Sequence, residues 1–536
     1  MAKKLFTGSV GIVCLLLVIL LPLLSPAAKT NNTGHPGEND EEGCYGCHEE
    51  IRILKEKSKH ANLSCTTCHG KLRDHLTNFE EKPVTDIDQK LCGTCHANEL
   101  NGLMSVNYKA QARKEKGVPT GRSPMMDKLL EPYGFTFEHN EPRSHAFMVT
   151  DQFVVDRFAG GRYRYKKGWH DVTSVGRTWD VLEDTGKTLP ETAKAGNPTC
   201  IQCKTSDHIL KWKFMGEKDS AAKWDRTSDI QAVAKDTHNP VGCIHCHDPH
   251  GTYPRIVRDA LIKRLAMDGS PMFADKNGKT SLSVIDFRGF RKIGIQAQAD
   301  SRMMCAQCHV EYACGPGYEF DTGKKIGFDD PRTNHFPLTG PKELLAHYKK
   351  LNFYDFKHAV TGARLVKLQH PEAETFHASI HDRNGVTCAD CHMPPEKDAT
   401  GQSYRNHGVI RPLHDVKAAC LRCHADSTVE KKLSEIEAIQ NYIRGKMRKS
   451  EYWLGRLIDT YETARRSGVP ESVLVRAREK HEEAHVLWEW WTAENSDGFH
   501  NPEIARETLA ASISASKAGV ALLGKAMEGR PRAGRK

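Results

Sequence analysis

Apolar residues recur at helical spacing through the C-terminal part of the chain. The first run covers residues 433–461, and its apolar positions are Leu433, Ile436, Ile439, Ile443, Met447, Leu454, Leu457, Ile458 and Tyr461. Apolar side chains three and four residues apart are typical of an amphipathic helix. Gly468 and Pro470 interrupt the pattern, so we expect this helix to end there.

Two further helices are predicted beyond that break. One carries an apolar face formed by Val473, Ala477, His481, Ala484, Trp488 and Trp491. The pair Asn501-Pro502 opens the other, because asparagine caps a helix and proline fits its first turn. Broad apolar faces suit an antiparallel bundle or a subunit interface. We therefore predict a C-terminal helical segment over residues 431–536 and expect a homo-oligomer.

The N-terminus shows a different pattern, a basic start followed by a long apolar run. Lys3 and Lys4 precede the run from Leu5 to Leu24, and Ala27-Ala28 offers a small-residue cleavage site. This order predicts a secretory signal over residues 1–28. The run is also long enough to span a bilayer, so an uncleaved membrane anchor is the alternative. In both cases the remainder is expected to be exported, into a periplasmic and oxidising space.

Strand signals between the two ends are few and short, and the composition adds a more informative feature. The 536 residues include 18 Cys and 28 His, whereas only 38% are hydrophobic, which excludes a polytopic membrane protein. A chain of this length does not need disulfides to compensate for a small core. The Cys and His content therefore indicates a bound metal or cofactor.

Sixteen of the cysteines form eight Cys-x-x-Cys pairs, and seven pairs are followed directly by His. These seven are Cys44/Cys47/His48, Cys65/Cys68/His69, Cys92/Cys95/His96, Cys243/Cys246/His247, Cys305/Cys308/His309, Cys388/Cys391/His392 and Cys420/Cys423/His424. Cys-x-x-Cys-His is the attachment motif of c-type haem, and chance would supply roughly 0.03 copies in such a chain. Zinc binding and a disulfide framework are the alternatives, but neither requires His after every second Cys. The eighth pair, Cys200 and Cys203, is followed by Lys204.

Eight covalently bound haems predict a mainly α protein, with a multihaem cytochrome c fold wrapped around the cofactors and long C-terminal helices. The spacing of the motifs divides the exported chain further. We expect an N-terminal three-haem domain over residues 29–138 and a five-haem domain over residues 139–430.

The net charge of +9, from 77 Lys and Arg against 68 Asp and Glu, fits this cofactor load. Each ferric haem with two ionised propionates contributes about one negative charge, so eight haems cancel most of the excess. The basic residues are spread along the chain rather than gathered in a stripe, so nucleic acid is not an expected partner.

Lys204 sets one haem apart from the other seven. A haem held between two His has no vacant position and transfers electrons only. A lysine binds iron as a neutral amine, and we expect the opposite face of this haem to be open, as in catalytic metal sites. The alternative is an ordinary lysine after a degenerate motif, with the iron bound from elsewhere.

Seven electron-carrying haems also need seven distal His ligands. Eight histidines are candidates by their sequence context, so at least one of them is not a ligand. They are His60, His75, His139, His145, His250, His381, His407 and His500.

Several strings resemble a known family, the ammonia-forming cytochrome c nitrite reductases. They are the Lys204 motif, Lys367 to Glu372 (Lys-Leu-Gln-His-Pro-Glu), Gly385 to Pro394 around Cys388, and Gly498 to Pro502. The pentahaem members would cover the chain from about His139 onward. The three additional N-terminal motifs make the whole exported length resemble the octahaem nitrite reductases.

The resemblance implies an Arg, a Tyr and a His on the open face of the Lys204 haem. His370 matches the His and Tyr312 matches the Tyr. Arg157 is the chosen Arg, and Arg143 is the alternative. A fixed positive charge would hold the small nitrite anion, and His370 could deliver protons near neutral pH.

The resemblance also implies a calcium ion beside the active site. Its ligands would be the side chains of Glu311 and Gln369 and the carbonyl oxygens of Tyr312 and Lys367, a set that suits this hard cation. The alternative is that Glu311 and Gln369 only satisfy nearby backbone groups.

The leading hypothesis is thus an exported octahaem enzyme that reduces nitrite to ammonium, fed by a redox donor protein or a quinol dehydrogenase. Hydroxylamine oxidation or sulfite reduction on a related scaffold is the second hypothesis. The third is a non-catalytic, electron-conducting multihaem cytochrome.

Cys314 is the only cysteine of the exported part outside the eight pairs, two residues after Tyr312. It is either a small buried thiol or, as the octahaem resemblance implies, linked by a thioether to the Tyr312 ring. A thioether would lower the phenol pKa and restrain the ring.

We expect denatured protein to show no alkylation at Cys314, because a thioether sulfur does not react with iodoacetamide. Peptide mapping by mass spectrometry should recover one cross-linked peptide containing Tyr312 and Cys314. A fully alkylated Cys314 would falsify the cross-link.

Overall fold

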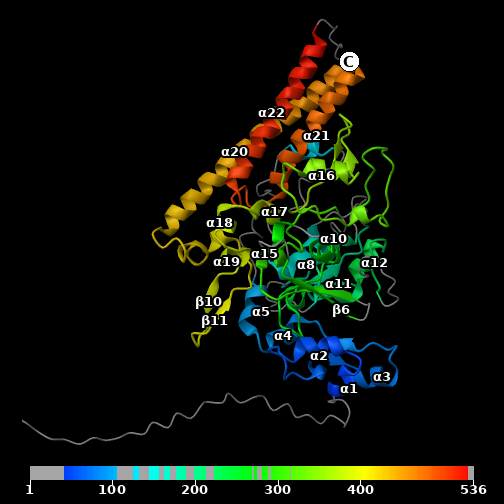
Figure 1. Ribbon diagram of the computed structural model, residues 1–536, viewed down its shortest axis with the longest axis vertical. Coiled ribbons are helices and arrows are strands. Elements are labelled where there is room, and N and C mark those ends of the chain that lie inside the picture. The colour runs from blue at the N-terminus through cyan, green and yellow to red at the C-terminus, as the bar shows by residue number, and fades with distance from the viewer. Residues whose placement is uncertain are drawn as a thin grey trace, which may run out of the picture.

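The computed structural model describes residues 41–105, 125–131, 144–155, 162–168, 177–188, 198–212, 222–267, 271–274, 280–287, 291–313 and 315–528. Within these ranges the chain is mainly helical, with small sheets of two or three strands (Figure 1). The long C-terminal helices lie at one end of the molecule and the N-terminal helices lie at the other. The predicted mainly α fold is confirmed.

The N-terminal region consists of short elements with almost no apolar core. Its helices are α1 (Glu41–Tyr45), α2 (Glu49–Lys55), α3 (Leu72–Thr77), α4 (Gln89–Gly93) and α5 (Ala97–Leu103). Strand β1 (His69–Gly70) pairs antiparallel with β2 (Val84–Thr85). Leu54 and Met104 are the only buried hydrophobic residues described between 41 and 105. Since so small a region needs some other source of stability, it fits a domain organised around cofactors.

The central region continues with short helices joined by long loops. Its helices are α7 (Met126–Leu129), α8 (Met148–Val155), α9 (Thr178–Val181), α10 (Thr199–Gln202), α11 (Asp207–Lys211), α12 (Ile230–Lys235), α13 (Cys243–Cys246), α14 (Asp259–Ile262), α15 (Ser301–Cys305), α16 (Leu344–Lys350), α17 (Glu372–Phe376), α18 (Ile380–Arg383) and α19 (Cys388–His392). Single turns of 3-10 or π helix link several of them.

The strands of this region form four small antiparallel sheets. In the largest, β7 (Arg291–Gln296) lies between β5 (Arg255–Ile256) and β6 (Leu282–Phe287), with Ile256 and Val284 both opposite Gly294. The two-stranded sheets are β3 (Tyr163–Tyr165) with β4 (Leu182–Asp184), β8 (Phe356–Lys357) with β9 (Arg364–Leu365), and β10 (Pro395–Lys397) with β11 (Ser403–Arg405). None is large enough to organise the fold, so strands here serve mainly to fix loops.

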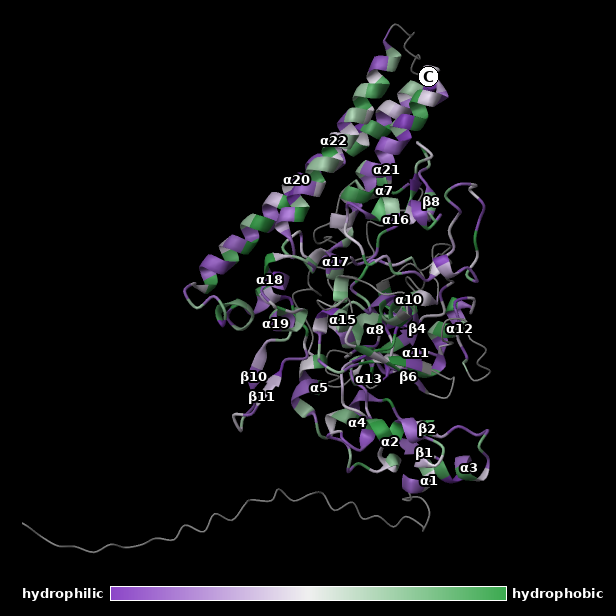
Figure 2. Cartoon of the chain, in the orientation of Figure 1, coloured by the Kyte–Doolittle hydropathy of each residue, from purple (hydrophilic) through white to green (hydrophobic). Residues whose placement is uncertain are grey.

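Three long helices form the C-terminal bundle, as the apolar spacing predicted. They are α20 (Val429–Arg466), α21 (Glu471–Ala493) and α22 (Pro502–Met527). Thr428 and Asn501 cap α20 and α22, since their side chains accept the N–H groups of Lys431 and Ile504. Green and purple residues alternate along these helices in Figure 2, as expected for amphipathic faces.

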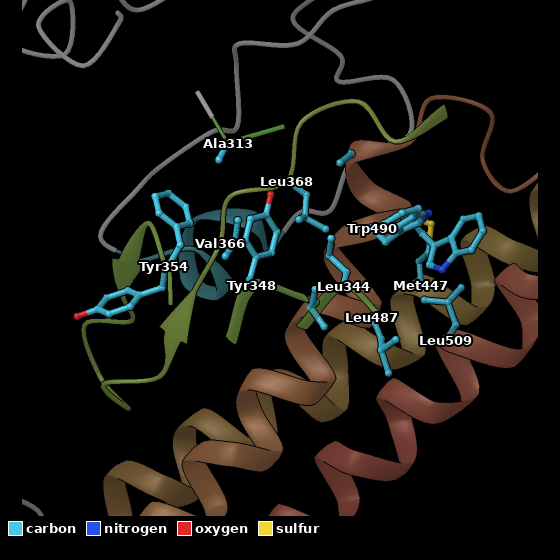
Figure 3. Close-up of a cluster of buried hydrophobic side chains, with 14 of the residues drawn as sticks. Ala313, Leu344, Tyr348, Tyr354, Val366, Leu368, Met447, Leu487, Trp490 and Leu509 are labelled. Atoms are coloured by element: carbon cyan, nitrogen blue, oxygen red, sulfur yellow. The ribbon is translucent and has the colours of Figure 1, made fainter. Parts of the chain in front are cut away.

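The bundle also packs on the central region. In Figure 3, Met447, Leu487, Trp490 and Leu509 from the three bundle helices gather with Leu344 and Tyr348 of α16 and with Leu368. Leu368 lies two residues before His370, so the bundle packs directly against the segment that carries this predicted active-site residue.

None of the helices in the described ranges is both long enough and apolar enough to cross a membrane.

Replacing Leu457 by alanine should destabilise the bundle. The side chain is 0% exposed, and a Cβ added at Gly519 of α22 would lie 2.6 Å from its Cδ1, so the helices are closely packed there. We expect a loss of about 2–5 kcal/mol in the free energy of unfolding, measured by urea titration. Val475→Ala on α21, which is 38% exposed, is the control and should change stability by less than about 0.5 kcal/mol. Equal effects of the two variants would contradict this packing.

Candidate haem sites and active site

Most of the Cys-x-x-Cys pairs lie in a single helical turn that brings the pair and the next residue to one side. The backbone N–H of His48 donates to the carbonyl of Cys44 at 3.0 Å, and His247 and His309 repeat this bond to Cys243 and Cys305. Residues separated by three and four positions lie on the same face of a helix. The two thiols and the imidazole can therefore approach one planar group together.

The sixteen predicted attachment cysteines differ in their exposure. Cys47, Cys95 and Cys423 are exposed, whereas Cys203 is buried and the other twelve are half-buried. Each of the three is the second cysteine of its motif, and a residue next to it in the chain is exposed as well. A thioether needs only a thiol at the porphyrin edge, so exposure is compatible with attachment.

The seven motif histidines each lie opposite a second histidine at nearly constant separation. The ring centroids are 6.2–6.4 Å apart in the pairs His48–His75, His60–His96, His69–His250, His145–His309, His247–His407, His381–His424 and His392–His500. A metal–nitrogen bond of about 2.0 Å, with about 1.15 Å from nitrogen to ring centroid, places two axial imidazoles about 6.3 Å apart. The spacing matches two histidines on opposite sides of one iron.

Seven of the eight distal candidates thus lie opposite a motif histidine, and His139 lies outside the described residues. His309 has two neighbours at 6.3 Å, His145 and His370. The roles of these residues as iron ligands remain predictions, but the structure brings the residues together in the arrangement that such ligation requires.

Hydrogen bonds at Nδ1 support the same use of these rings. His60, His75 and His407 each have Nδ1 within 2.6–2.8 Å of a backbone carbonyl oxygen. A carbonyl only accepts, so Nδ1 carries the proton and Nε2 is the deprotonated nitrogen. That tautomer can bind a metal through Nε2.

Several exposed apolar side chains lie close in the sequence to these motifs and their paired histidines. Ile53 is 65% exposed, Phe79 is 69% exposed and lies edge-on to the His75 ring, and Ile380 is 59% exposed beside His381. Leu63 and Leu76 flank Cys65 and His75 in the same way. Large apolar side chains gathered at these positions fit a porphyrin that would cover them.

The motifs also touch one another. Thiols of different motifs lie within hydrogen-bonding reach in the pairs Cys44–Cys65, Cys92–Cys243, Cys203–Cys308 and Cys305–Cys388. Cys68 with Cys92, Cys246 with Cys305, and Cys391 with Cys420 are close enough for their charges to interact. All eight motifs are therefore connected, and the one at Cys305–His309 is a junction that leads to the Lys204 motif.

The Lys204 motif lies next to a buried arginine that the sequence did not single out. Arg258 donates to Cys203 Sγ, and its guanidinium lies 5.2 Å from the centroid of the Tyr312 ring. Phe336 stacks on Tyr312 at 5.7 Å and holds the ring from another side. Arg258 thus joins the eighth motif to the predicted catalytic tyrosine.

The predicted calcium ligands converge on one another. Gln369 donates its backbone N–H to Glu311 Oε2 at 2.7 Å, and its side-chain nitrogen lies 3.0 Å from the Lys367 carbonyl oxygen. Glu311 is 0% exposed, and burial raises its pKa to about 8, against the hydrogen bonds from Gln369 and Tyr348 that lower it. A buried carboxylate beside a carbonyl and an amide fits a hard cation. The same contacts also fit the alternative in which Glu311 satisfies a backbone group.

His370 is tied to a buried carboxylate on its C-terminal side. The side-chain nitrogen of Asn495 lies 3.4 Å from His370 Nδ1 and donates to Glu372 Oε1. The other Glu372 oxygen lies 3.4 Å from His309 Nδ1. Burial opposes ionisation of Glu372, but the hydrogen bond from His309 and the charges of His309 and His370 lower its pKa to about 2. Glu372 therefore links a motif histidine to the predicted catalytic histidine.

The structure does not place every predicted residue. Arg157, its alternative Arg143, Cys314 and the N-terminal segment 1–28 lie outside the described residues. In the described ranges, no group of three or more His, Cys, Asp or Glu side chains could hold a metal ion.

Cys-x-x-Cys-His turns with paired histidines define a c-type cytochrome with several haems, and comparison with known proteins agrees. Residues 104–530 match the cytochrome c552 family. A cytochrome c-552 of Bacteroides fragilis is 26% identical over 389 residues, which cover 72% of this chain and 65% of the relative. The cytochrome c nitrite reductase subunit NrfA of Nitratidesulfovibrio vulgaris is 27% identical over 418 residues, covering 74% of this chain and 68% of that one. The chain belongs to the cytochrome c552 family.

Among solved structures, a cytochrome c nitrite reductase from Desulfovibrio desulfuricans, described for two calcium sites in its catalytic subunit, shares the fold. It is 24% identical with a TM-score of 0.53, covering 74% of each chain. The chain spans slightly less than two thirds of the length of the Bacteroides relative. The family match begins at residue 104, so the motifs at Cys44, Cys65 and Cys92 precede it.

Removing one distal ring should create one vacant iron position. In His407→Ala, His247 would lose the ring 6.3 Å away, so electron paramagnetic resonance should show one more high-spin haem than the wild type. The control is His347→Ala, because His347 pairs with His335 and not with a motif. An unchanged spectrum for His407→Ala would contradict the assigned pair.

Proposed function

We propose that this chain is an exported octahaem c-type cytochrome that reduces nitrite to ammonium at the Lys204 haem. The observation that carries the proposal is the contrast between seven paired histidines and the eighth motif. The eighth motif ends in Lys204, and Arg258 contacts both Cys203 of this motif and the ring of Tyr312. Seven saturated haems would supply electrons to the one that can bind a substrate.

The haem, when bound, supplies electrons and a coordination position for the substrate nitrogen. Arg157 and His370 would donate hydrogen bonds to the nitrite oxygens, where negative charge accumulates as the N–O bonds break. His370 would also deliver protons, with Asn495 holding its ring through Nδ1. Tyr312 would donate a further hydrogen bond from a ring fixed between Arg258 and Phe336.

A calcium ion would support this site through Glu311, Gln369 and the carbonyls of Tyr312 and Lys367. It would neutralise the buried Glu311 carboxylate and fix the backbone on either side of Tyr312 and His370. Glu311 directly precedes Tyr312, and Gln369 directly precedes His370. This supports the role of the calcium ion, because moving either ligand would move a proposed catalytic residue.

The remaining parts of the proposal concern supply and assembly. The connected motifs offer a route from the N-terminal three-haem region through Cys243 and Cys305 to Lys204. An upstream redox protein or a quinol dehydrogenase would feed this route. The bundle helix α20 leaves Tyr442 50% and Tyr452 55% exposed, which supports self-association through this surface.

A turnover assay on the exported, haem-loaded protein tests the reaction. With reduced viologen as donor, nitrite should give ammonium, and hydroxylamine and sulfite should be slower substrates. Lys204→His should abolish turnover, because a histidine-ligated haem would resemble the seven carriers. His347→Ala is the control and should keep wild-type turnover. A wild-type protein that consumes no nitrite, or releases no ammonium from it, would contradict the proposal.

A further inference from the structure

The segment leading to His370 is held by carboxylates instead of by a sheet. Residues 366–370 have no regular secondary structure, yet three consecutive backbone N–H groups are all satisfied. Those of Lys367, Leu368 and Gln369 donate to Asp355 Oδ2 at 2.7 Å, Glu489 Oε1 at 3.2 Å and Glu311 Oε2 at 2.7 Å. Three side chains from separate parts of the chain therefore fix the path of the backbone into His370.

Glu489 makes the most contacts of the three. It is 0% exposed on α21, and its Oε1 also lies 3.0 Å from the Lys367 ammonium. Its Oε2 lies 2.9 Å from Nε2 of His485, one helical turn earlier on α21. With both oxygens occupied by groups of fixed position, the carboxylate has one available geometry.

The same end of the bundle supports the residues that follow His370. Trp490 Nε1 donates to Thr375 Oγ1 at 2.8 Å, and Asn495 reaches Glu372 and His370. Leu368 itself is 0% exposed and packs in the cluster drawn in Figure 3. The bundle therefore contacts the His370 segment before, at and after the histidine.

We infer that Glu489 is a positioning residue for the active site, so that the C-terminal bundle determines the geometry of His370 and of the calcium ligands. This inference rests on the proposed function. Without the carboxylate, the Lys367 ammonium and the Leu368 N–H lose their shared partner. The Leu368 N–H belongs to the same planar peptide group as the Lys367 carbonyl, so this carbonyl loses the contact that orients it. Gln369 depends on that carbonyl, since its side-chain nitrogen lies 3.0 Å away.

Glu482 offers a matched control on the same helix. It is also buried, and its Oε1 accepts the backbone N–H of Arg364 at 3.1 Å and the Arg364 Nε at 3.2 Å. These contacts repeat those of Glu489 but hold β9 instead of residues 367–370. Glu482→Gln therefore reports the general cost of altering a buried carboxylate of α21.

The experiment compares Glu489→Gln with Glu482→Gln in the full-length, haem-loaded protein. Haem content and melting temperature establish that both variants fold. Calcium chloride is titrated into chelator-treated protein by isothermal titration calorimetry, and kcat and KM for nitrite are measured with a viologen donor. For Glu489→Gln we expect the Kd for calcium to rise by about ten- to a hundredfold and kcat to fall by a similar factor, with KM less affected.

Equal values of the Kd for calcium and of kcat in the two variants would overturn the inference. Should Glu489→Gln not fold, Lys367→Met replaces it, because that change removes the ion pair but keeps the carbonyl. It should weaken calcium binding in the same direction, and wild-type affinity would overturn the inference. If the wild type binds calcium but makes no ammonium, the proposed reaction fails while the calorimetric comparison still decides the role of Glu489.

Discussion

An iron bound between two imidazoles constrains the chain more strongly than any local preference, because it fixes two backbone segments at one distance. The His69–His250 pair joins residues far apart in the sequence at a ring separation of 6.3 Å, and His392–His500 does the same across the start of the bundle. With few apolar residues buried in the described N-terminal region, the proposed haem sites would take the place of a conventional core there. Short helices and small sheets follow, since each element only has to deliver a motif or a ligand.

The same constraint would allow the proposed electron route and the proposed catalytic site to share one scaffold. Motifs that each occupy a single turn can approach closely, and the Cys305–His309 motif contacts both the Lys204 motif and the Cys388 motif. At Lys204 the residue after the second cysteine changes from histidine to lysine, and the surroundings change as well. Arg258, Tyr312 and Phe336 form a buried stack. The segment that leads to His370 is held by carboxylates, and one of them, Glu489, comes from bundle helix α21.

The sequence predicted the parts of this arrangement that depend on local patterns. Local patterns predicted the three C-terminal helices, the break at Gly468 and Pro470 and the helix start at Asn501-Pro502, and the helices were predicted correctly. It also supplied His60 and His250 as candidate ligands, but not that His60 faces His96 while His250 faces His69. Those pairings depend on chain folding over long distances, which spacing alone does not encode.

The functional residues that sequence analysis did not identify also depend on long-range folding. Arg258 is an ordinary arginine in the string Arg255 to Arg258, and only the fold brings it to Tyr312. Glu489 lies between the buried residues Trp488 and Trp490 of α21, so its neighbours predict only a place in the core. Its role depends on Lys367, which lies 122 positions earlier in the chain. Arg157 and Cys314, in contrast, were predicted from resemblance and lie outside the described residues.

Quantitative spin-state spectroscopy of the wild-type protein tests the central claim most directly. Magnetic circular dichroism, calibrated against the haem content, should show seven low-spin haems and one high-spin haem in the oxidised protein. Added nitrite should perturb only the high-spin signal. Eight low-spin haems in both the oxidised and the reduced protein would contradict the account, because no iron would then have a position for substrate.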